Sequence, residues 1–111
     1  MRFEEEHFEG QQRERYSSYY ERDPRLRAKA ITLHGTTCVA CGFDFEKKYG
    51  EYGKDYIEVH HIKPVSELGG NTRINPQTDM AVLCSNCHRI VHRKRERVLS
   101  IDELKRSIVV V

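Results

Sequence analysis

Four cysteines occur as two closely spaced pairs, and their spacing is typical of a structural zinc site. Cys38 and Cys41 form one C-x2-C pair, and Cys84 and Cys87 form the other. Two such pairs supply four thiolates, and an all-cysteine shell binds zinc tetrahedrally in closed sites that hold a fold together. A zinc finger made of the second pair and the histidines after it is excluded, because a finger separates its two pairs by roughly a dozen residues. The sequence therefore predicts one structural Zn²⁺ bound by the four cysteines.

Four histidines could form a second site, and this one could carry out hydrolysis. His88 and His92 are spaced i and i+4, so they lie on one face of a helix and can clamp a metal ion. His60 and His61 are neighbours near the end of a predicted strand, so their side chains diverge. One of them can complete the metal site while the other takes a proton from water, because neutral imidazole is both a good ligand and a base near neutral pH.

The identity of this catalytic divalent metal stays open among Mg²⁺, Mn²⁺, Ni²⁺ and Zn²⁺. A shell of imidazoles suits zinc or nickel better than magnesium. Magnesium can still bind through water and phosphate oxygens. Whichever cation binds, its role in hydrolysis would be to polarise a phosphoryl oxygen and to stabilise the leaving oxygen.

Helices and strands must bring these residues together. Asp23 followed by Pro24 is a typical helix start and Gly35 is a natural stop, so we predict a helix over residues 24–34. The glycine-punctuated segment EKKYGEYGKDY is predicted to be an exposed loop. YIEVHHI has the composition of a strand, and MAVL that of a short buried strand.

Two further helices complete the prediction. The segment CSNCHRIVHRKRE is predicted to form a helix that carries the second cysteine pair and the i, i+4 histidines. Ser100 and Glu103 form a capping-box pattern, which opens a last helix from Asp102 to about Ser107. The order is helix, cysteine turn, strand, loop, strand, helix and helix. This order predicts a small α+β domain that is stapled by zinc.

The length of 111 residues suits one compact domain. We expect an N-terminal extension over residues 1–23 that is partly helical, the domain itself over residues 24–107, and a tail over residues 108–111. A chain of this size buries a limited core and often needs a metal or disulfide staple. The N-terminus lacks an apolar signal region and no apolar run could span a bilayer, so we expect a cytoplasmic protein without membrane contact.

The motifs together resemble those of the HNH endonucleases, and among them the branch of McrA-like modification-dependent restriction enzymes. The resemblance runs from about residue 24 to about residue 104 and includes the segment YGEYGKDYIEVHHIKP. The combined motif is Cys38-x2-Cys41, Glu58-Val-His60-His61-Ile62 and Asp79-Met-Ala-Val-Leu-Cys84-Ser-Asn-Cys87-His88-x3-His92. The resemblance implies a ββα-metal fold, in which a helix crosses a two-stranded hairpin and one catalytic metal lies between them.

The resemblance also implies roles for the histidines. By position, His60 and His88 become ligands of the catalytic metal, and His61 becomes the general base. His92 matches only those members in which the helix carries an H-x3-H pair. In those members it is a third metal ligand, whereas elsewhere it is a phosphate contact, and here we favour the ligand.

The carboxylates near the site receive weaker predictions. Asp79 takes the place of the family's middle asparagine, which orients the general base by hydrogen bonding. An aspartate can accept a bond from imidazole and raise its basicity, but it cannot donate as an amide does, so Asn75 nearby could share the task. Glu58 is predicted to be a charge on the exposed side of a strand rather than a ligand.

The positions of the charged residues are more informative about a partner than the net charge of the chain. The formal net charge of +2 is too small to imply a nucleic-acid partner. The stretch from His88 to Arg97 is basic and could meet phosphates, although a solvated helix face is the plain alternative. Given the histidine site beside it, we predict that Arg89, Arg93 and Lys94 follow the helix face and contact the DNA backbone.

The sequence thus predicts an enzyme, a metal-dependent endonuclease that hydrolyses phosphodiester bonds of double-stranded DNA by nicking or by double-strand cleavage. The resemblance implies 5′-phosphate and 3′-hydroxyl products. Because one site cuts one strand, a double-strand break could require a homodimer. An additional specificity domain could supply sequence recognition. Two alternatives stay open: a zinc-stapled nucleic-acid-binding module without catalysis, which the full set of histidines disfavours, and a hydrolase of another substrate, which the basic stretch disfavours.

Overall fold

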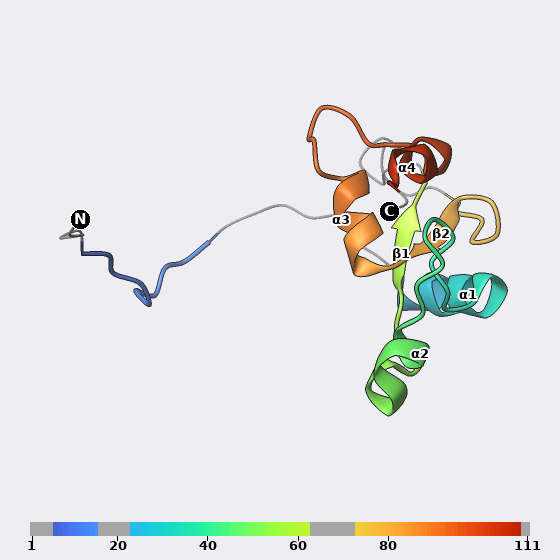
Figure 1. Cartoon of the computed structure of the whole chain (residues 1–111), viewed down its shortest axis with the longest axis horizontal. Helices are drawn as coiled ribbons and strands as arrows, with labels where there is room; N and C mark the ends of the chain where they lie inside the picture. The colour runs from blue at the N-terminus through green and yellow to red at the C-terminus, as the bar shows by residue number, and fades with distance from the viewer. Residues whose placement is uncertain (1–5, 16–22, 63–72, 110–111) are drawn as a thin grey trace.

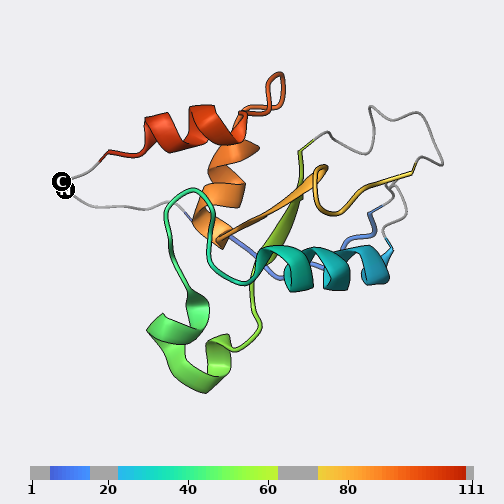
Figure 2. The ribbon, with the colours of Figure 1, turned by 90° about the vertical axis from the view of Figure 1, so that its right-hand side faces the viewer.

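The computed structural model describes residues 6–15, 23–62 and 73–109. Its centre is an antiparallel hairpin of β1 (Glu58–His61) and β2 (Met80–Leu83). Helix α1 (Pro24–His34) packs on one side of the hairpin and helix α3 (Ser85–Val91) on the other, as Figures 1 and 2 show. A hairpin crossed by a helix confirms the predicted α+β class.

The alternation along β1 sends its side chains to opposite sides of the hairpin. Glu58 and His60 face α3, where each lies against a histidine of that helix. Val59 and His61 instead line a cleft together with Leu26 of α1. The two neighbouring histidines are therefore divided between the two faces, as their place in a strand predicts.

Helix α1 begins and ends where the sequence predicts. The Asp23 carboxylate accepts a 2.9 Å hydrogen bond from the backbone N–H of Arg25, and Pro24 occupies the first turn. Gly35 ends the helix with a φ of 84°. This conformation costs glycine little free energy, because glycine has no Cβ. Ala30 is fully buried on the side of α1 that packs against the strands.

The segment after the first cysteine pair is helical, so the prediction of an exposed loop was wrong. It forms α2 (Phe45–Tyr49), which continues into the 3-10 helix η1 (Gly50–Gly53). The Asp44 carboxylate caps α2 by accepting two backbone N–H groups of its first turn. A Cβ on Gly53 would lie 2.1 Å from the Phe45 carbonyl oxygen. Glycine at this position thus allows two backbones to approach closely within a helical lobe.

The core is small and is built around the cysteines. Its buried cluster consists of Cys38, Leu83, Cys84, Cys87, Val91 and Leu104. Partly buried Phe43 and Phe45 pack against this cluster, as expected of aromatic side chains next to the first cysteine pair. Because three of the six buried side chains are cysteines, the packing of the core depends on what holds the thiols.

Helix α3 is shorter than predicted. It ends at Val91, and His92 is its C-cap. The chain then turns back, because Leu99 donates its N–H to the Val91 carbonyl at 3.2 Å and an antiparallel bridge joins Lys94 to Arg97. The prediction that the basic residues after His92 continue the helix was therefore wrong, and these residues lie on a turn.

The last helix, α4 (Ile101–Ser107), begins one residue earlier than predicted. The predicted capping box is present: the Ser100 hydroxyl accepts the Glu103 N–H at 3.1 Å, and the Glu103 carboxylate accepts the Ser100 N–H at 3.0 Å. Leu104 is buried and joins α4 to the core cluster beside α3.

The described part of the N-terminal extension, residues 6–15, forms no helix or strand, so the expected helical part would have to fall on residues 1–5 or 16–22. The tyrosine-rich residues 16–22 lie outside the described residues. Within the described ranges, no helix is both long enough and apolar enough to cross a membrane.

Candidate functional site

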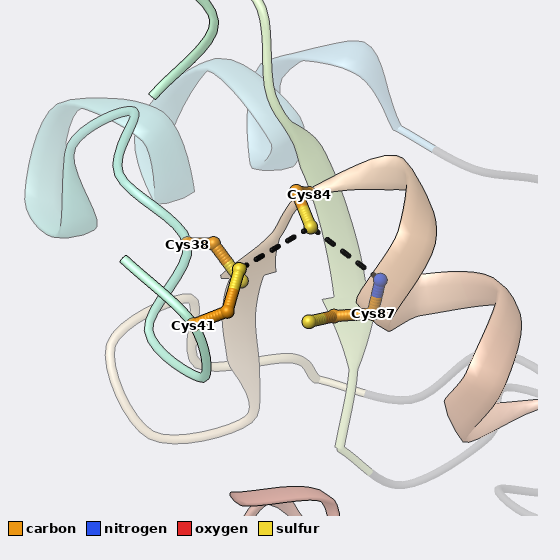
Figure 3. A group of neighbouring side chains, drawn as sticks. All are labelled: Cys38, Cys41, Cys84 and Cys87. Atoms are coloured by element: carbon orange, nitrogen blue, oxygen red, sulfur yellow. Dashed lines mark hydrogen bonds between the residues drawn. The ribbon is translucent and has the colours of Figure 1, made fainter. Parts of the chain in front are cut away.

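The four cysteines converge, as their spacing predicts. Figure 3 shows Cys38 and Cys41 on the turn before α2, facing Cys84 and Cys87 at the junction of β2 and α3. Their sulfur atoms all lie within 4.8 Å of one another, and none is in a disulfide. The sulfurs of Cys41 and Cys84 are 3.6 Å apart, and the Cys87 N–H donates to the Cys84 sulfur at 3.4 Å. Four thiols gathered in this way fit a tetrahedral zinc ion.

The thiols differ in how readily they ionise. Burial raises the pKa of Cys87 and also that of Cys41. At Cys38 burial acts in the same direction, but hydrogen bonds from backbone N–H groups outweigh it and lower the pKa to about 7. Metal ions bind the thiolate form, so Cys38 ionises most readily, whereas a bound cation would favour the ionisation of Cys41 and Cys87.

Three histidines form a second cluster. His60 of β1 lies next to His88 and His92 at the end of α3, and one ring nitrogen from each lies within 4.8 Å of the other two. The centroids of the three rings are 5.1 to 5.4 Å apart. The structure thus brings together the three histidines that the sequence predicts as metal ligands. His92 reaches this cluster from the C-cap position rather than from a helical turn.

His60 supplies a test of whether a cation fits this cluster. The residue is only 2% exposed, and its Nδ1 has no hydrogen-bond partner. Burial lowers the pKa of His60 to about 4, and the neighbouring histidines act in the same direction, so the ring is neutral at neutral pH. A buried ring nitrogen without a partner costs free energy. One nitrogen of this buried, neutral ring belongs to the cluster, so a divalent cation among the three imidazoles would give the ring a polar partner, and the residues fit such an ion.

Glu58 lies beside the histidine cluster, and the prediction that it is on the exposed side of the strand was wrong, although it is not one of the clustered ligands. One carboxylate oxygen lies 2.7 Å from Nδ1 of His88, and the other accepts the hydroxyl of Ser85 at 2.6 Å. The hydrogen bond from Ser85, followed by that from His88, lowers the pKa of Glu58 despite partial burial. An ionised Glu58 makes Nδ1 of His88 the donor, which leaves Nε2 of that ring to bind a cation. The i, i+2 spacing of Glu58 and His60 could have revealed that both lie on one face of β1, although not that Ser85 and His88 lie opposite Glu58.

His61 lies on the opposite face of the hairpin. It borders a cleft of about 140 Å³ whose other lining residues include Val59 and Met80 of the strands and Leu26 and Arg27 of α1. The Arg27 guanidinium is anchored at this cleft by a 2.8 Å hydrogen bond to the Ile57 carbonyl. His61 is therefore half-buried at the edge of an open cleft, where water can reach it.

Asp79 shapes the chain that enters β2. Its carboxylate accepts the Asn75 backbone N–H at 2.8 Å and the Thr78 hydroxyl at 3.3 Å, and its own N–H donates to the Asn75 carbonyl at 2.8 Å. The Asp79 carbonyl accepts the N–H of Ile62, the residue after His61. These contacts place both Asp79 and Asn75 beside the end of β1. The two hydrogen bonds of the Asp79 carboxylate hold the loop rather than an imidazole.

The three cations that the sequence assigns to DNA contacts do not share one helix face. Arg89 is exposed on α3, where its charge contributes to the lowered pKa of Glu58 after the hydrogen bonds of that group. Arg93 and Lys94 are exposed on the turn that follows the C-cap. All three belong to the segment that carries the histidine ligands, but two of them project from a turn.

The architecture defines the class of protein. A two-stranded hairpin crossed by a helix, with three imidazoles between strand and helix and a further histidine on the adjacent strand position, is a ββα-metal domain. The sequence model of the HNH endonuclease family matches residues 38–94, just over half of the chain. The protein therefore belongs to the HNH endonuclease family.

A curated protein is also similar. The type IV methyl-directed restriction enzyme EcoKMcrA of Escherichia coli (strain K12) is 37% identical over 91 residues, which cover 82% of this chain. The same residues cover 31% of that enzyme, so the chain spans about a third of the length of this relative.

Replacing Glu58 with glutamine should weaken binding of a divalent cation at the histidine cluster without unfolding the domain. The Glu58 carboxylate has two charged oxygens, one for Ser85 and one for His88. The glutamine side chain has one neutral amide oxygen, so it accepts more weakly and the His88 ring loses its fixed orientation. Loss of such an outer partner typically lowers metal affinity by about 10- to 100-fold. Titration of the zinc-loaded protein with Ni²⁺, followed by calorimetry, would measure the change.

The matched control is Glu51→Gln, which removes the same charge from the exposed helix η1. This variant should bind Ni²⁺ like the wild type. Equal affinities for all three proteins would show that Glu58 does not orient the ligand.

Proposed function

We propose that this chain is a metal-dependent DNA endonuclease domain in which His61 activates water and His60, His88 and His92 hold a catalytic divalent cation. The observation that carries the proposal is the convergence of three imidazole nitrogens within 4.8 Å, one of them from the strand that also presents His61. The description of the similar EcoKMcrA protein as a methyl-directed restriction enzyme supports DNA as the substrate.

In the proposed chemistry the two faces of β1 have different tasks. His61 on one face acts as the general base, and His60 on the other face helps to hold the cation. His61 accepts a proton from water, and the resulting hydroxide attacks the phosphorus of a phosphodiester in line with the departing oxygen. When bound, the cation at the histidine cluster supplies positive charge for the phosphoryl and leaving oxygens. Departure of the 3′ oxygen leaves a 5′-phosphate and a 3′-hydroxyl, the ends that the family resemblance implies.

The remaining residues of the proposed site act by positioning. Glu58 fixes the orientation of the His88 ring through its 2.7 Å contact. Asp79 holds the loop that enters β2, with the Asn75 backbone as its partner, and its carbonyl accepts the N–H of the residue after His61. We assign Asp79 this positioning role at the backbone beside the general base.

We further propose that the cysteine cluster holds one structural Zn²⁺. The four thiols come from two segments that are far apart in the sequence, and three of them are buried in the core cluster. Zinc there would fix the turn before α2 against the start of α3. This places the ion in the scaffold and away from the reaction.

The exposed cations of the α3 segment support a contact with the DNA backbone. Arg89, Arg93 and Lys94 can neutralise phosphates on either side of the cleaved bond, and such contacts position a duplex without reading its sequence. Since one site cleaves one strand, we propose that a double-strand break requires a second copy of the domain or a further nicking event. A specificity domain elsewhere would supply base recognition.

The test is cleavage of supercoiled plasmid by the full chain, loaded with zinc and freed of other metals. Addition of Mg²⁺, Mn²⁺, Ni²⁺ or further Zn²⁺ should convert the plasmid to nicked circles with at least one of these ions, and a chelator should stop the reaction. Binding of the plasmid without cleavage under every cation would instead support the nucleic-acid-binding module. If the chain neither bound nor cleaved the plasmid, DNA would be rejected as the substrate.

A further inference from the structure

The turn that follows the last histidine is unusually well held for an exposed segment. This basic turn, residues 93–97, is closed by the bridge between Lys94 and Arg97 and is tied at its base by the hydrogen bond from Leu99 to Val91. A third tie is the ion pair between the Arg97 guanidinium and the Glu103 carboxylate of α4. A turn with three ties has a defined position relative to α3.

The charge of the basic turn is strongly one-sided. Four of its five residues are cationic, and Glu96 is the one anionic residue. All five are exposed. Its first residue, Arg93, directly follows His92, which belongs to the histidine cluster. The charge therefore begins next to the proposed reaction site.

A cleft runs beneath the basic turn and has two kinds of lining. Its volume is about 470 Å³. We call the apolar part of its lining the floor (Ile90, Val91 and Leu99) and the charged part the rim (Arg93, Lys94, Glu96 and Arg97). Ile90 is 49% exposed on this floor. A sugar–phosphate strand offers the complementary pattern, since its phosphates suit the cationic rim and the carbon faces of its deoxyriboses suit the apolar floor.

We propose that the basic turn and the cleft beneath it form a preorganised clamp for the DNA backbone, and that the Arg97–Glu103 ion pair is its positioning element. This inference rests on the proposed function and extends the contacts of Arg93 and Lys94 to Arg95, to the cleft and to the ion pair that positions the turn. The turn extends beyond residues 38–94, the part that matches the family. In this clamp Arg93, Lys94 and Arg95 meet phosphates, while Glu103 touches no DNA and acts through Arg97.

The variant Glu103→Gln separates positioning from charge. Glutamine can replace glutamate in a capping box, so α4 keeps its N-terminal cap while the ion pair is lost. The substitution also makes the region more positive, so charge alone predicts tighter DNA binding and a steeper dependence on salt. If the ion pair positions the clamp, binding should instead weaken by about threefold, the scale of one exposed ion pair, and the salt slope should become shallower by about one released counterion.

The matched control is Asp102→Asn, which removes the same charge from the exposed residue before Glu103, outside the cleft, and leaves the ion pair intact. It should bind DNA as tightly as the parent or more tightly. A second variant, Arg97→Gln, breaks the pair from the other side and keeps Glu103 in the capping box. It should weaken binding about as much as Glu103→Gln does, although the two variants change the net charge in opposite directions.

The measurement is fluorescence anisotropy of a labelled duplex at several salt concentrations, with every variant made in the full zinc-loaded chain that carries His61→Ala to prevent cleavage. Thermal melts establish that each variant is folded. If affinities simply follow net charge, so that Glu103→Gln binds more tightly and Arg97→Gln more weakly, the positioning role is wrong. Failure of the wild type to bind or cleave DNA would reject the proposed function itself, whereas cleavage by the wild type combined with charge-following variants would reject only this inference.

Discussion

Removal of zinc from the cysteine cluster is expected to unfold the domain, which is the largest effect that the structure predicts for any single change. Cys38, Cys84 and Cys87 form half of the buried cluster, so the proposed zinc ion would be part of the core. Structural zinc contributes roughly 10 kcal/mol or more to folding in small domains. A domain of this size has a total stability of about 5–15 kcal/mol, so loss of the ion leaves little or no net stability.

Circular dichroism and methyl NMR spectra recorded during titration with a strong chelator would check this expectation. Helical signal and dispersed methyl resonances should be lost together as zinc leaves, and both should return when zinc is added back. Cys84→Ser should not fold even with zinc in excess, because a hydroxyl is a poor ligand in place of a thiolate.

The control for zinc removal is His92→Ala, which lies in the other cluster. This variant should keep one tightly bound zinc per chain and a native spectrum. A chelated protein that contains no zinc but retains its methyl spectrum would refute the structural role of the ion.

Local signals in the sequence identified the elements that depend on neighbouring residues. Helix α1 was predicted with its bounds because Asp23, Pro24 and Gly35 act within the helix or directly beside it. The capping box of α4 is equally local, and its two hydrogen bonds involve residues three apart. The cysteine cluster and the histidine cluster could also be predicted. The spacing within each cysteine pair and between His88 and His92 depends only on the turn or helix that carries those residues.

Features that depend on distant contacts were missed. The lobe of α2 and η1 requires Gly53 to lie against the Phe45 carbonyl, and glycine content alone suggested a loop. The residues after His92 have good helix propensity, but the hydrogen bond from Leu99 to Val91 draws the chain back. Tertiary contacts override propensity in both places.

The partner of Glu58 illustrates the same limit within the site. Its position two residues before His60 fixes its face of the strand but not what α3 places opposite. Only the packing of α3 across the hairpin brings Ser85 and His88 to its two oxygens. The ligands of a site can thus be recognised from sequence spacing more readily than the residues that orient them.

Replacement of His61 with alanine should lower the rate of DNA cleavage by about 10²- to 10⁴-fold, the usual contribution of a general base. The substitution removes the imidazole from the open cleft on the α1 side, whereas the three clustered histidines and the four thiols are on other side chains and stay in place. The folded state, the zinc content and the affinity for duplex DNA should therefore remain close to those of the wild type. Single-turnover nicking of supercoiled plasmid, measured at the most active cation, gives the rate.

His7→Ala is the matched control, because it makes the same substitution in the exposed N-terminal segment, away from both clusters in sequence. It should cleave at the wild-type rate. Imidazole added to the buffer should restore part of the activity of His61→Ala, since a small base can enter the vacated cleft, and it should not accelerate the control. Equal rates for His61→Ala and the wild type would mean that water is activated by another group, whereas a loss of activity accompanied by a loss of Ni²⁺ binding would mean that His61 serves the metal cluster rather than the proton transfer.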